Sequence, residues 1–403
     1  MTARKKESSK PRLDLKTLDR QLSELPKKIV YCRNCVVSNQ RPRTEFNEQG
    51  ICSACQWAWE KDHVVDWAAR DKELRELCDR HRSKDGSYDV IVPGSGGKDS
   101  AYTSHVLKYK YGMNPLTVTW APHKYTEIGW KNFENWLHVG GHDNLLFTPN
   151  GKLHRYLTRL AFINLLHPFQ PFIVGQRIIG PALARKFGVK LVMYGENQAE
   201  YGNNPDENYK PTMDRKFFSA GDPTEMTLGG VPVRDIIKEG NFTLNDFAPY
   251  IPPSADDLEK SGVEVHYLGY YLKWDPQECY YYAAEHTGFK ANTERTEGSY
   301  SKYSSIDDRI DPFHYYTTLI KFGIGRATYD AAQEIRNDKI TREEGVALVK
   351  KYDQEFPAKY YPEFLDYIGL NEQEFAATVD KFRSPHLWEP SGNSWRLKHT
   401  VSD

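Results

Sequence analysis

The chain has 403 residues, of which 39% are hydrophobic and 27% charged, and its net charge is −1. This length allows one large core with smaller attached parts. Residues 1–28 hold nine Lys and Arg against four Asp and Glu, so the rest of the chain carries about −6. An acidic body is a poor electrostatic match for nucleic acid, and no apolar run approaches membrane-spanning length. We therefore expect no nucleic-acid partner, no membrane span, a cytoplasmic location and a disordered basic tail over residues 1–28.

Four of the six cysteines form two C-x-x-C pairs, Cys32 with Cys35 and Cys52 with Cys55. Each pair places two thiolates on one knuckle, and two knuckles complete a tetrahedral site with four sulfur ligands. In a reducing compartment Zn²⁺ is the natural occupant, and an iron–sulfur cluster is the alternative. Four protein ligands leave no open coordination position, so residues 29–58 are predicted to form a structural zinc ribbon.

A linking helix is predicted over residues 59–86, and beyond it strand and helix patterns alternate. Strands are predicted at 88–92, 115–120, 144–147, 190–194 and 263–268, and helices at 100–111, 127–139, 151–166 and 174–187. This alternation predicts an α/β domain with a doubly wound parallel sheet, formed by residues 87–202 and 263–274.

The remaining segments differ in composition. Residues 203–262 are rich in Pro, Gly, Asn and Asp, and we interpret them as an irregular cap over the substrate. Residues 275–390 are predicted to be helical, with helix starts marked by Asp275, Thr341 and Asn371, each followed by Glu three positions later. Residues 391–403 are predicted to form a tail.

The most informative motif is the run Gly94, Ser95, Gly96, Gly97, Lys98, Asp99 and Ser100 between the first predicted strand and helix. Glycines let the backbone approach an oxyanion, and the first N–H groups of the helix point toward it. Lys98 adds a positive charge, and the two serines add hydroxyl donors. The spacing is not that of a Walker A loop. It resembles the SGGxDS signature of PP-loop ATP pyrophosphatases, which cleave ATP between the α and β phosphates. The alternative is a turn that only connects a strand to a helix.

Such a cleavage gives a chemical role to several residues. Lys98, the loop amides and Mg²⁺ would neutralise the departing pyrophosphate. Asp99 either holds the metal or the loop, or is an ordinary acidic residue in a first helical turn. In a doubly wound sheet the ligand lies at the carboxyl ends of the strands. Trp120 and Gly195 are therefore predicted to border the nucleotide.

Other polar residues near predicted strand ends and glycine turns are candidates for substrate contact. Glu196 and Asn197 could meet an amide being activated, with a turn or helix cap as the alternative. Arg177 could bind a carboxylate or phosphate in a bidentate way, with a surface ion pair as the alternative. Lys321 and Arg326 flank a glycine loop suited to an anion. For Asp307 and Asp308, helix capping is favoured over Mg²⁺ binding.

The nucleophile is not evident in the sequence. A glutamine-hydrolysing domain needs a catalytic cysteine beside a base, and only Cys78 and Cys279 lie outside the C-x-x-C pairs. Neither has a glycine-rich setting, so ammonia would have to come from another protein.

Taken in order, several motifs resemble the N-acetyl sugar amidotransferases of bacterial surface-polysaccharide biosynthesis. They are the cysteine ribbon, residues 94–100, 175–177 (GQR), 194–197 (YGEN), 200–202 (EYG), 267–271 (YLGYY), 305–308 (SIDD), 321–328 (KFGIGRAT) and 334–336 (EIR). The resemblance covers most of residues 30–390 and adds Gln176, Glu200 and Tyr201 to the predicted substrate-binding residues. Lys98, Asp99 and Glu196 are the predicted catalytic residues.

The resemblance implies an AMP-forming enzyme that uses ATP and Mg²⁺. Such an enzyme adenylates the N-acetyl amide of a nucleotide-activated sugar, with a UDP-2,3-diacetamido uronic acid as the expected substrate. Ammonia then replaces the amide oxygen, giving an acetamidino sugar for lipopolysaccharide and O-antigen biosynthesis. The implied partners are a separate glutaminase and a cyclase-like barrel, similar to the subunits of imidazole-glycerol-phosphate synthase.

Two other functions are compatible with the motifs. A tRNA-thiolating PP-loop enzyme would need further cysteines in the α/β domain and a basic tRNA-binding face. A nucleotide-binding scaffold without enzymatic activity would bind ATP and release no pyrophosphate.

Overall fold

The computed structural model of the chain describes residues 24–202 and 209–402. Most of the basic tail predicted at residues 1–28 lies outside the described residues, as do the first positions of the segment 203–262. Within the described part, no helix is both long enough and apolar enough to cross a bilayer.

A sheet of five parallel strands forms the centre of the molecule, in the order β3-β2-β1-β4-β7. The strands are β1 (Val90–Pro93), β2 (Pro115–Trp120), β3 (Asp143–Phe147), β4 (Leu191–Tyr194) and β7 (Glu264–Tyr267). β1 and β2 are buried along their whole length, as expected for parallel strands covered on both faces. The predicted doubly wound α/β fold is confirmed. The direction of winding reverses between β1 and β4, so a crevice is expected at their carboxyl ends.

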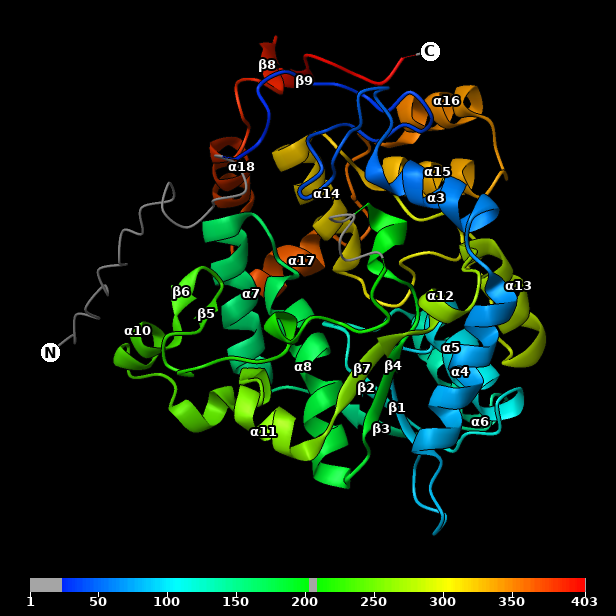
Figure 1. The fold of residues 1–403 in the computed structure, drawn as a ribbon. Helices are drawn as coiled ribbons and strands as arrows, with labels where there is room; N and C mark the ends of the chain where they lie inside the picture. The colour runs from blue at the N-terminus through cyan, green and yellow to red at the C-terminus, as the bar shows by residue number, and fades with distance from the viewer. Residues whose placement is uncertain (1–23, 203–208, 403) are drawn as a thin grey trace, which may run out of the picture.

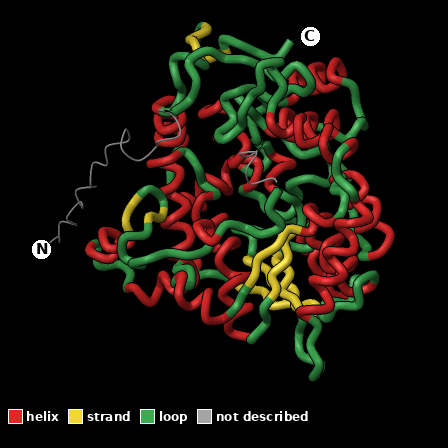
Figure 2. Tube along the Cα trace, viewed as in Figure 1, coloured by secondary structure: helices red, strands yellow, loops and turns green. Residues whose placement is uncertain are grey.

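Helices cover both faces of this sheet (Figures 1 and 2). α5 (Lys98–Tyr109) packs on one face, with α4 (Trp67–His81), α6 (Glu127–His138) and α13 (Pro276–His286) on the same side. α8 (Gln170–Phe187) packs on the other face, and α7 (Gly151–Leu165) packs against α8. The core between these layers includes Ile91, Leu107, Leu157 and Val192, each fully buried.

The connection from the ribbon to the sheet differs from the single helix predicted at 59–86. α3 (Ser53–His63) begins inside the second cysteine pair, and a second helix, α4, follows. The break occurs at Asp66, whose carboxylate accepts hydrogen bonds from the N–H groups of Ala68 and Ala69, both at 3.0 Å. This N-cap ends one helix and starts the next.

The described part of the segment 203–262 is not irregular. It contains η2 (Arg215–Phe217), β5 (Thr227–Leu228), β6 (Val231–Pro232), α10 (Val233–Lys238), η3 (Leu244–Tyr250) and α11 (Ala255–Ser261). η3 packs on α8, and Phe247 and Tyr250 are buried in the main core. Met213 N donates to Val265 O at 2.8 Å, which fastens the segment alongside β7. Most of this segment is therefore a packed extension of the α/β domain.

The predicted helical C-terminal region is present. It consists of α13 together with α14 (Asp311–Phe322), α15 (Arg326–Arg336), α16 (Arg342–Tyr352), α17 (Tyr361–Ile368) and α18 (Glu372–Lys381). The short helix α12 (Leu268–Tyr271) precedes this region, within the segment 263–274 predicted for the α/β domain. Thr341 and Asn371 form reciprocal capping boxes with Glu344 and Glu374. Instead of a simple tail, β8 (Trp388–Ser391) and β9 (Ser394–Leu397) form a hairpin.

The ribbon is packed onto this helical region. Ala331, Ala332 and Ile335 of α15 and Val346 of α16 share a hydrophobic cluster with the four ribbon cysteines. The α15–α16 pair therefore supports the ribbon with its apolar face. Figure 1 shows α3 beside α15 and below α16.

Candidate active site

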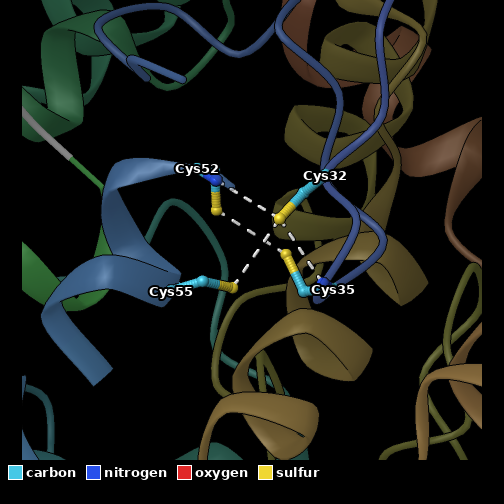
Figure 3. A group of neighbouring side chains, drawn as sticks. All are labelled: Cys32, Cys35, Cys52 and Cys55. Atoms are coloured by element: carbon cyan, nitrogen blue, oxygen red, sulfur yellow. Dashed lines mark hydrogen bonds between the residues drawn. The ribbon is translucent and has the colours of Figure 1, made fainter. Parts of the chain in front are cut away.

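The four predicted metal ligands come together at the start of α3. Cys32 and Cys35 lie on a turn, Cys52 is the N-cap of α3, and Cys55 lies in its first turn (Figure 3). Their sulfur atoms all lie within 4.8 Å of one another, and all four side chains are buried. Four buried thiols that converge on one point are the donor set that Zn²⁺ prefers in structural sites. The residues therefore fit the structural zinc expected from the sequence.

We expect the purified protein to contain about one zinc ion per chain and to show no visible absorbance. Replacing Cys35 with Ser should lower the zinc content and the melting temperature together, because metal binding contributes to folding free energy. Cys279→Ser is the matched control, since Cys279 is equally buried but lies outside the cluster. Iron in place of zinc, with a brown colour, would contradict the assignment.

Residues 94–97 connect β1 to α5 in a conformation that requires glycine. Gly96 has φ +82°, and a Cβ atom there would lie 2.9 Å from the Cα of Phe133. A Cβ atom on Gly94 would lie 2.1 Å from that of Ser100. The Ser100 hydroxyl accepts from Gly96 N at 3.2 Å and donates to Gly97 O at 3.1 Å. Gly94 and Ser100 thus hold the shape of the loop rather than line the cavity beside it.

This loop forms one wall of a cavity of about 250 Å³ at the carboxyl ends of the strands. The N-cap of α5 is Gly97, which offers no side chain to the first helical N–H groups. Those N–H groups and the positive end of the helix dipole are therefore available to an anion. The cavity is lined by Ser95, Gly96, Gly97, Lys98, Asp99, Gly129, Asn132, Glu196, Tyr201, Phe289, Tyr303, Ser304, Ser305, Ile306, Asp307, Asp311, Tyr315, Arg326 and Gln333.

Lys98, Asp99 and Glu196 form a charged group beside the loop. Lys98 Nζ lies 2.6 and 2.7 Å from the two carboxylate oxygens of Asp99. Burial acts to lower the pKa of Lys98, but the charges of Asp99 and Glu196 outweigh it and the pKa is raised. Burial and the Asp99 charge raise the pKa of Glu196 to about 7, although Lys98 and a hydrogen bond from Tyr201 oppose the increase. Glu196 can therefore exchange a proton near neutral pH.

The opposite wall comes from the C-terminal helical region. Asp311 and Tyr315 lie on the first turns of α14, and Arg326 begins α15. The Arg326 guanidinium lies 4.3 Å from the centre of the Tyr315 ring and forms an ion pair with Asp330 at 3.0 Å. Burial raises the pKa of Asp311 to about 7, despite the nearby Arg326 charge. The cavity thus holds two carboxyl groups that titrate near neutrality.

Asp307 and Asp308 take different positions. Asp308 is buried and accepts from the N–H groups of His123 at 2.7 Å and Ile310 at 2.9 Å. It thus holds the turn that precedes α14, but the N-cap of α14 is Ile310, so the helix capping favoured from the sequence is not its role. Asp307 lines the cavity instead, where its carboxylate is hydrogen-bonded to Ser95. Burial raises the pKa of Asp307, although that hydrogen bond acts against the increase.

Glu200, predicted to bind substrate, is buried at the junction between α3 and the α/β domain. Its carboxylate accepts from Trp57 Nε1 at 2.8 Å and lies 3.2 Å from Lys61 Nζ, and only 3% of Glu200 is exposed. Lys61 also donates to Trp274 O and Asn337 Oδ1, each at 2.9 Å. Because these groups are buried and occupied, Glu200 joins the ribbon helix α3 to the α/β domain rather than contacting a ligand.

Several other predicted residues lie outside this cavity. The Trp120 ring packs under α8, where a Cβ on Gly175 would lie 2.3 Å from it. Gly195 lies against the Trp274 ring, since a Cβ atom on Gly195 would be 2.9 Å from that ring. The buried Asn197 caps η1 (Gln198–Tyr201) by accepting from Ala199 N at 3.2 Å. Gln176, Arg177 and Lys321 also lie outside the cavity. The backbone carbonyl of Gln176 accepts from the Tyr194 hydroxyl at 3.2 Å, and the Arg177 guanidinium lies over the Phe217 ring. Lys321 Nζ donates to Leu165 O at 2.8 Å.

Sequence comparison identifies one part of the chain. Residues 297–401 match the family described as "LPS biosynthesis protein WbpG-like, C-terminal domain". No curated protein matches the chain. Among solved structures, 38 chains match, including NMN synthetase from Francisella tularensis, at 12% identity and a TM-score of 0.30. That match covers 77% of this chain and 96% of the other. The region matched by the family, 297–401, includes Asp307, Asp311, Tyr315, Arg326 and Gln333 of the cavity.

Proposed function

We propose that the chain, whose residues 297–401 match the WbpG-like lipopolysaccharide biosynthesis family, is an ATP-dependent amidotransferase acting on a nucleotide-activated sugar. One observation carries this proposal: a single cavity is lined by the glycine loop, by Lys98 and by Glu196, whose pKa is raised to about 7. The loop suits the phosphates of ATP, and the carboxyl group suits proton transfer during addition of a nitrogen nucleophile.

The proposed reaction has two steps. The acetamido oxygen of the sugar attacks the α-phosphorus of ATP, so that an oxygen–phosphorus bond forms and the α–β anhydride bond breaks. Pyrophosphate leaves, and its charge is stabilised by Lys98 and the N–H groups of the first turn of α5. Ammonia then adds to the activated carbon, a proton passes to Glu196, and AMP leaves with the former amide oxygen. The products are an acetamidino sugar, AMP and pyrophosphate.

Mg²⁺ fits the oxygen donors of this cavity. The carboxylates of Asp99 and Asp307 line it beside the loop, and carboxylate oxygen is the ligand type that Mg²⁺ prefers. When bound with ATP, the ion would supply further neutralisation of phosphate charge.

The source of ammonia is proposed to be a separate glutaminase, acting with a cyclase-like barrel. Cys78 and Cys279, the two cysteines outside the ribbon, are each buried. Burial raises the pKa of Cys78 to about 12, and it also raises the pKa of Cys279. Neither thiol is suited to attack glutamine, because the thiolate is the reactive form. The same argument weighs against tRNA thiolation, which would need reactive cysteines in the α/β domain.

The proposal is tested by incubating the protein with UDP-2,3-diacetamido uronic acid, ATP, Mg²⁺ and excess ammonium, followed by mass spectrometry. Replacing one oxygen with NH lowers the mass of the sugar by about one unit, and AMP should appear in equal amount. AMP without the mass change would remove the sugar assignment but keep ATP cleavage. ATP binding without pyrophosphate release would favour a scaffold.

The pH dependence of turnover provides a second test. If Glu196 accepts the proton, turnover should rise through about pH 7 as its carboxyl group ionises, and should level off above that. Total ammonium is adjusted at each pH so that unprotonated ammonia stays constant. Glu196→Gln should lower turnover by about 10²–10⁴-fold and remove this inflection. A Glu196→Gln variant with the same pH profile as the original protein would rule out this role.

A further inference from the structure

Three arginines gather between the ribbon and the α/β domain, outside the cavity described above. Arg41 and Arg43 lie in the loop between the two cysteine pairs, and Arg177 lies on α8. The guanidinium groups of Arg43 and Arg177 lie 5.2 and 5.4 Å from the centre of one ring, that of Phe217. Segments more than 130 residues apart in the sequence thus place two positive charges around a single aromatic side chain.

The third arginine connects this group to the loop cavity. The Arg41 guanidinium lies 5.7 Å from the centre of the Tyr201 ring and 5.6 Å from that of Tyr329. Tyr201 lines the cavity and donates a hydrogen bond to Glu196. Arg41 therefore stands beside the cavity wall that carries the proposed proton acceptor, and Arg43 follows it two residues later in the same ribbon loop.

Within the part of the chain that the structure describes, these three guanidinium groups form no ion pair. Among the described residues, no carboxylate lies within ion-pair distance of Arg41, Arg43 or Arg177. Arg177 is half-buried, and burial lowers its pKa, with the charge of Arg43 adding to the decrease. Placing Arg43 and Arg177 beside one ring and partly burying Arg177 costs free energy unless an anion compensates the charges, because like charges repel and a buried charge loses its hydration. Guanidinium groups beside aromatic rings are the groups proteins use to bind phosphate and carboxylate.

The backbone of the ribbon loop provides a second, independent observation. Arg43 adopts φ +69°, a left-handed conformation that a non-glycine residue rarely takes. Glycine would adopt this conformation without strain, yet the position carries a long cationic side chain directed at Phe217. Strained backbone of this kind concentrates at functional sites.

We propose that the zinc ribbon is a substrate-binding element, in which Arg41 and Arg43 act with Arg177 to hold the diphosphate of a nucleoside-diphosphate substrate. This inference rests on the proposed function for the identity of the anion. Cys32, Cys35, Cys52 and Cys55 converge on either side of the loop, and zinc bound to them would fix the positions of Arg41 and Arg43. The acceptor substrate then lies across Tyr201, with its reacting end in the cavity and its phosphates outside.

The test uses the zinc-loaded full chain saturated with α,β-methylene-ATP and titrated with UDP by calorimetry. We expect UDP to bind alongside the ATP analogue. Arg41→Ala, Arg43→Ala and Arg177→Ala should each weaken UDP binding by about tenfold or more, and should leave the affinity for the ATP analogue unchanged. Arg33→Ala is the matched control, because Arg33 lies on the same ribbon but contacts Gly50.

Arg43→Gly separates binding from folding. Relief of the left-handed strain should keep or raise the melting temperature, while UDP affinity falls as in Arg43→Ala. The inference is overturned if UDP fails to bind or displaces the ATP analogue. It is also overturned if the arginine variants bind UDP as tightly as the original protein does, or if they lose affinity for tRNA and keep their affinity for UDP. If the original protein binds UDP through these arginines but makes no AMP, the proposed function fails and the site remains.

Discussion

Lys98→Ala should lower turnover by about 10²–10³-fold while leaving the fold intact. Lys98 is the cation of the glycine loop, and its ammonium group lies where the β and γ phosphates of ATP are proposed to bind. Loss of one such group from a buried site costs about 10²–10³-fold in rate, because the charge that develops on pyrophosphate is no longer neutralised. The measurement is AMP release at saturating ATP, with circular dichroism and zinc content as checks of folding.

Two further variants sharpen this prediction. Lys108→Ala removes a lysine from the other end of the same helix, where Lys108 contacts Gly141, and should turn over normally. Lys98→Arg keeps the charge but changes its geometry, so partial activity is expected. Because Lys98 lowers the pKa of Glu196, the residual activity of Lys98→Ala should also require a higher pH. Near-normal AMP release by Lys98→Ala would refute the proposed role of the loop.

The parts of the fold and site that local patterns specify were predictable. β2 begins at Pro115 and ends at Trp120, as expected, because its β-branched and aromatic residues favour a strand. The loop at 94–100 was predictable because a strand, three glycines and a helix start are adjacent in the sequence. The cysteine cluster was predictable because its ligand spacing is itself the signal.

Apart from Arg326, which the glycine loop before it indicated, the opposite wall of the cavity was not predictable from local pattern. Asp311 and Tyr315 lie one turn apart on α14, more than 200 residues after the loop, and both look like ordinary positions of an amphipathic helix. Only tertiary packing brings them to Lys98. Trp120 ends a strand at the carboxyl edge of the sheet, but its ring fills the space left by Gly175 of α8 and does not line the loop cavity. The end of a predicted strand indicates which edge of the sheet a residue lies at, but it does not show which face of the sheet the side chain points to.

Glu200 leads to the prediction with the largest effect on stability. Only 1% of the Lys61 side chain and 4% of the Glu200 side chain are exposed, and the two charges lie 3.2 Å apart. Removing one member of a buried ion pair leaves the other charge uncompensated, which costs about 3–5 kcal/mol. We therefore expect Lys61→Met and Glu200→Gln each to lower the free energy of unfolding by that amount, measured by urea denaturation.

The double variant distinguishes the ion pair from other effects of the substitutions. Lys61→Met with Glu200→Gln removes both charges, so it should recover most of the stability lost by either single change. Lys72→Met is the surface control, since Lys72 and Glu76 are both exposed and their pair at 3.9 Å should contribute little. If the double variant loses the sum of the two single losses in free energy of unfolding, Lys61 and Glu200 do not stabilise each other as a pair. Because Ser53 of α3 also donates to Gly202 O at 2.8 Å, weakening this junction should loosen the ribbon. UDP affinity should then fall along with stability, whereas the affinity of the loop for ATP should change little.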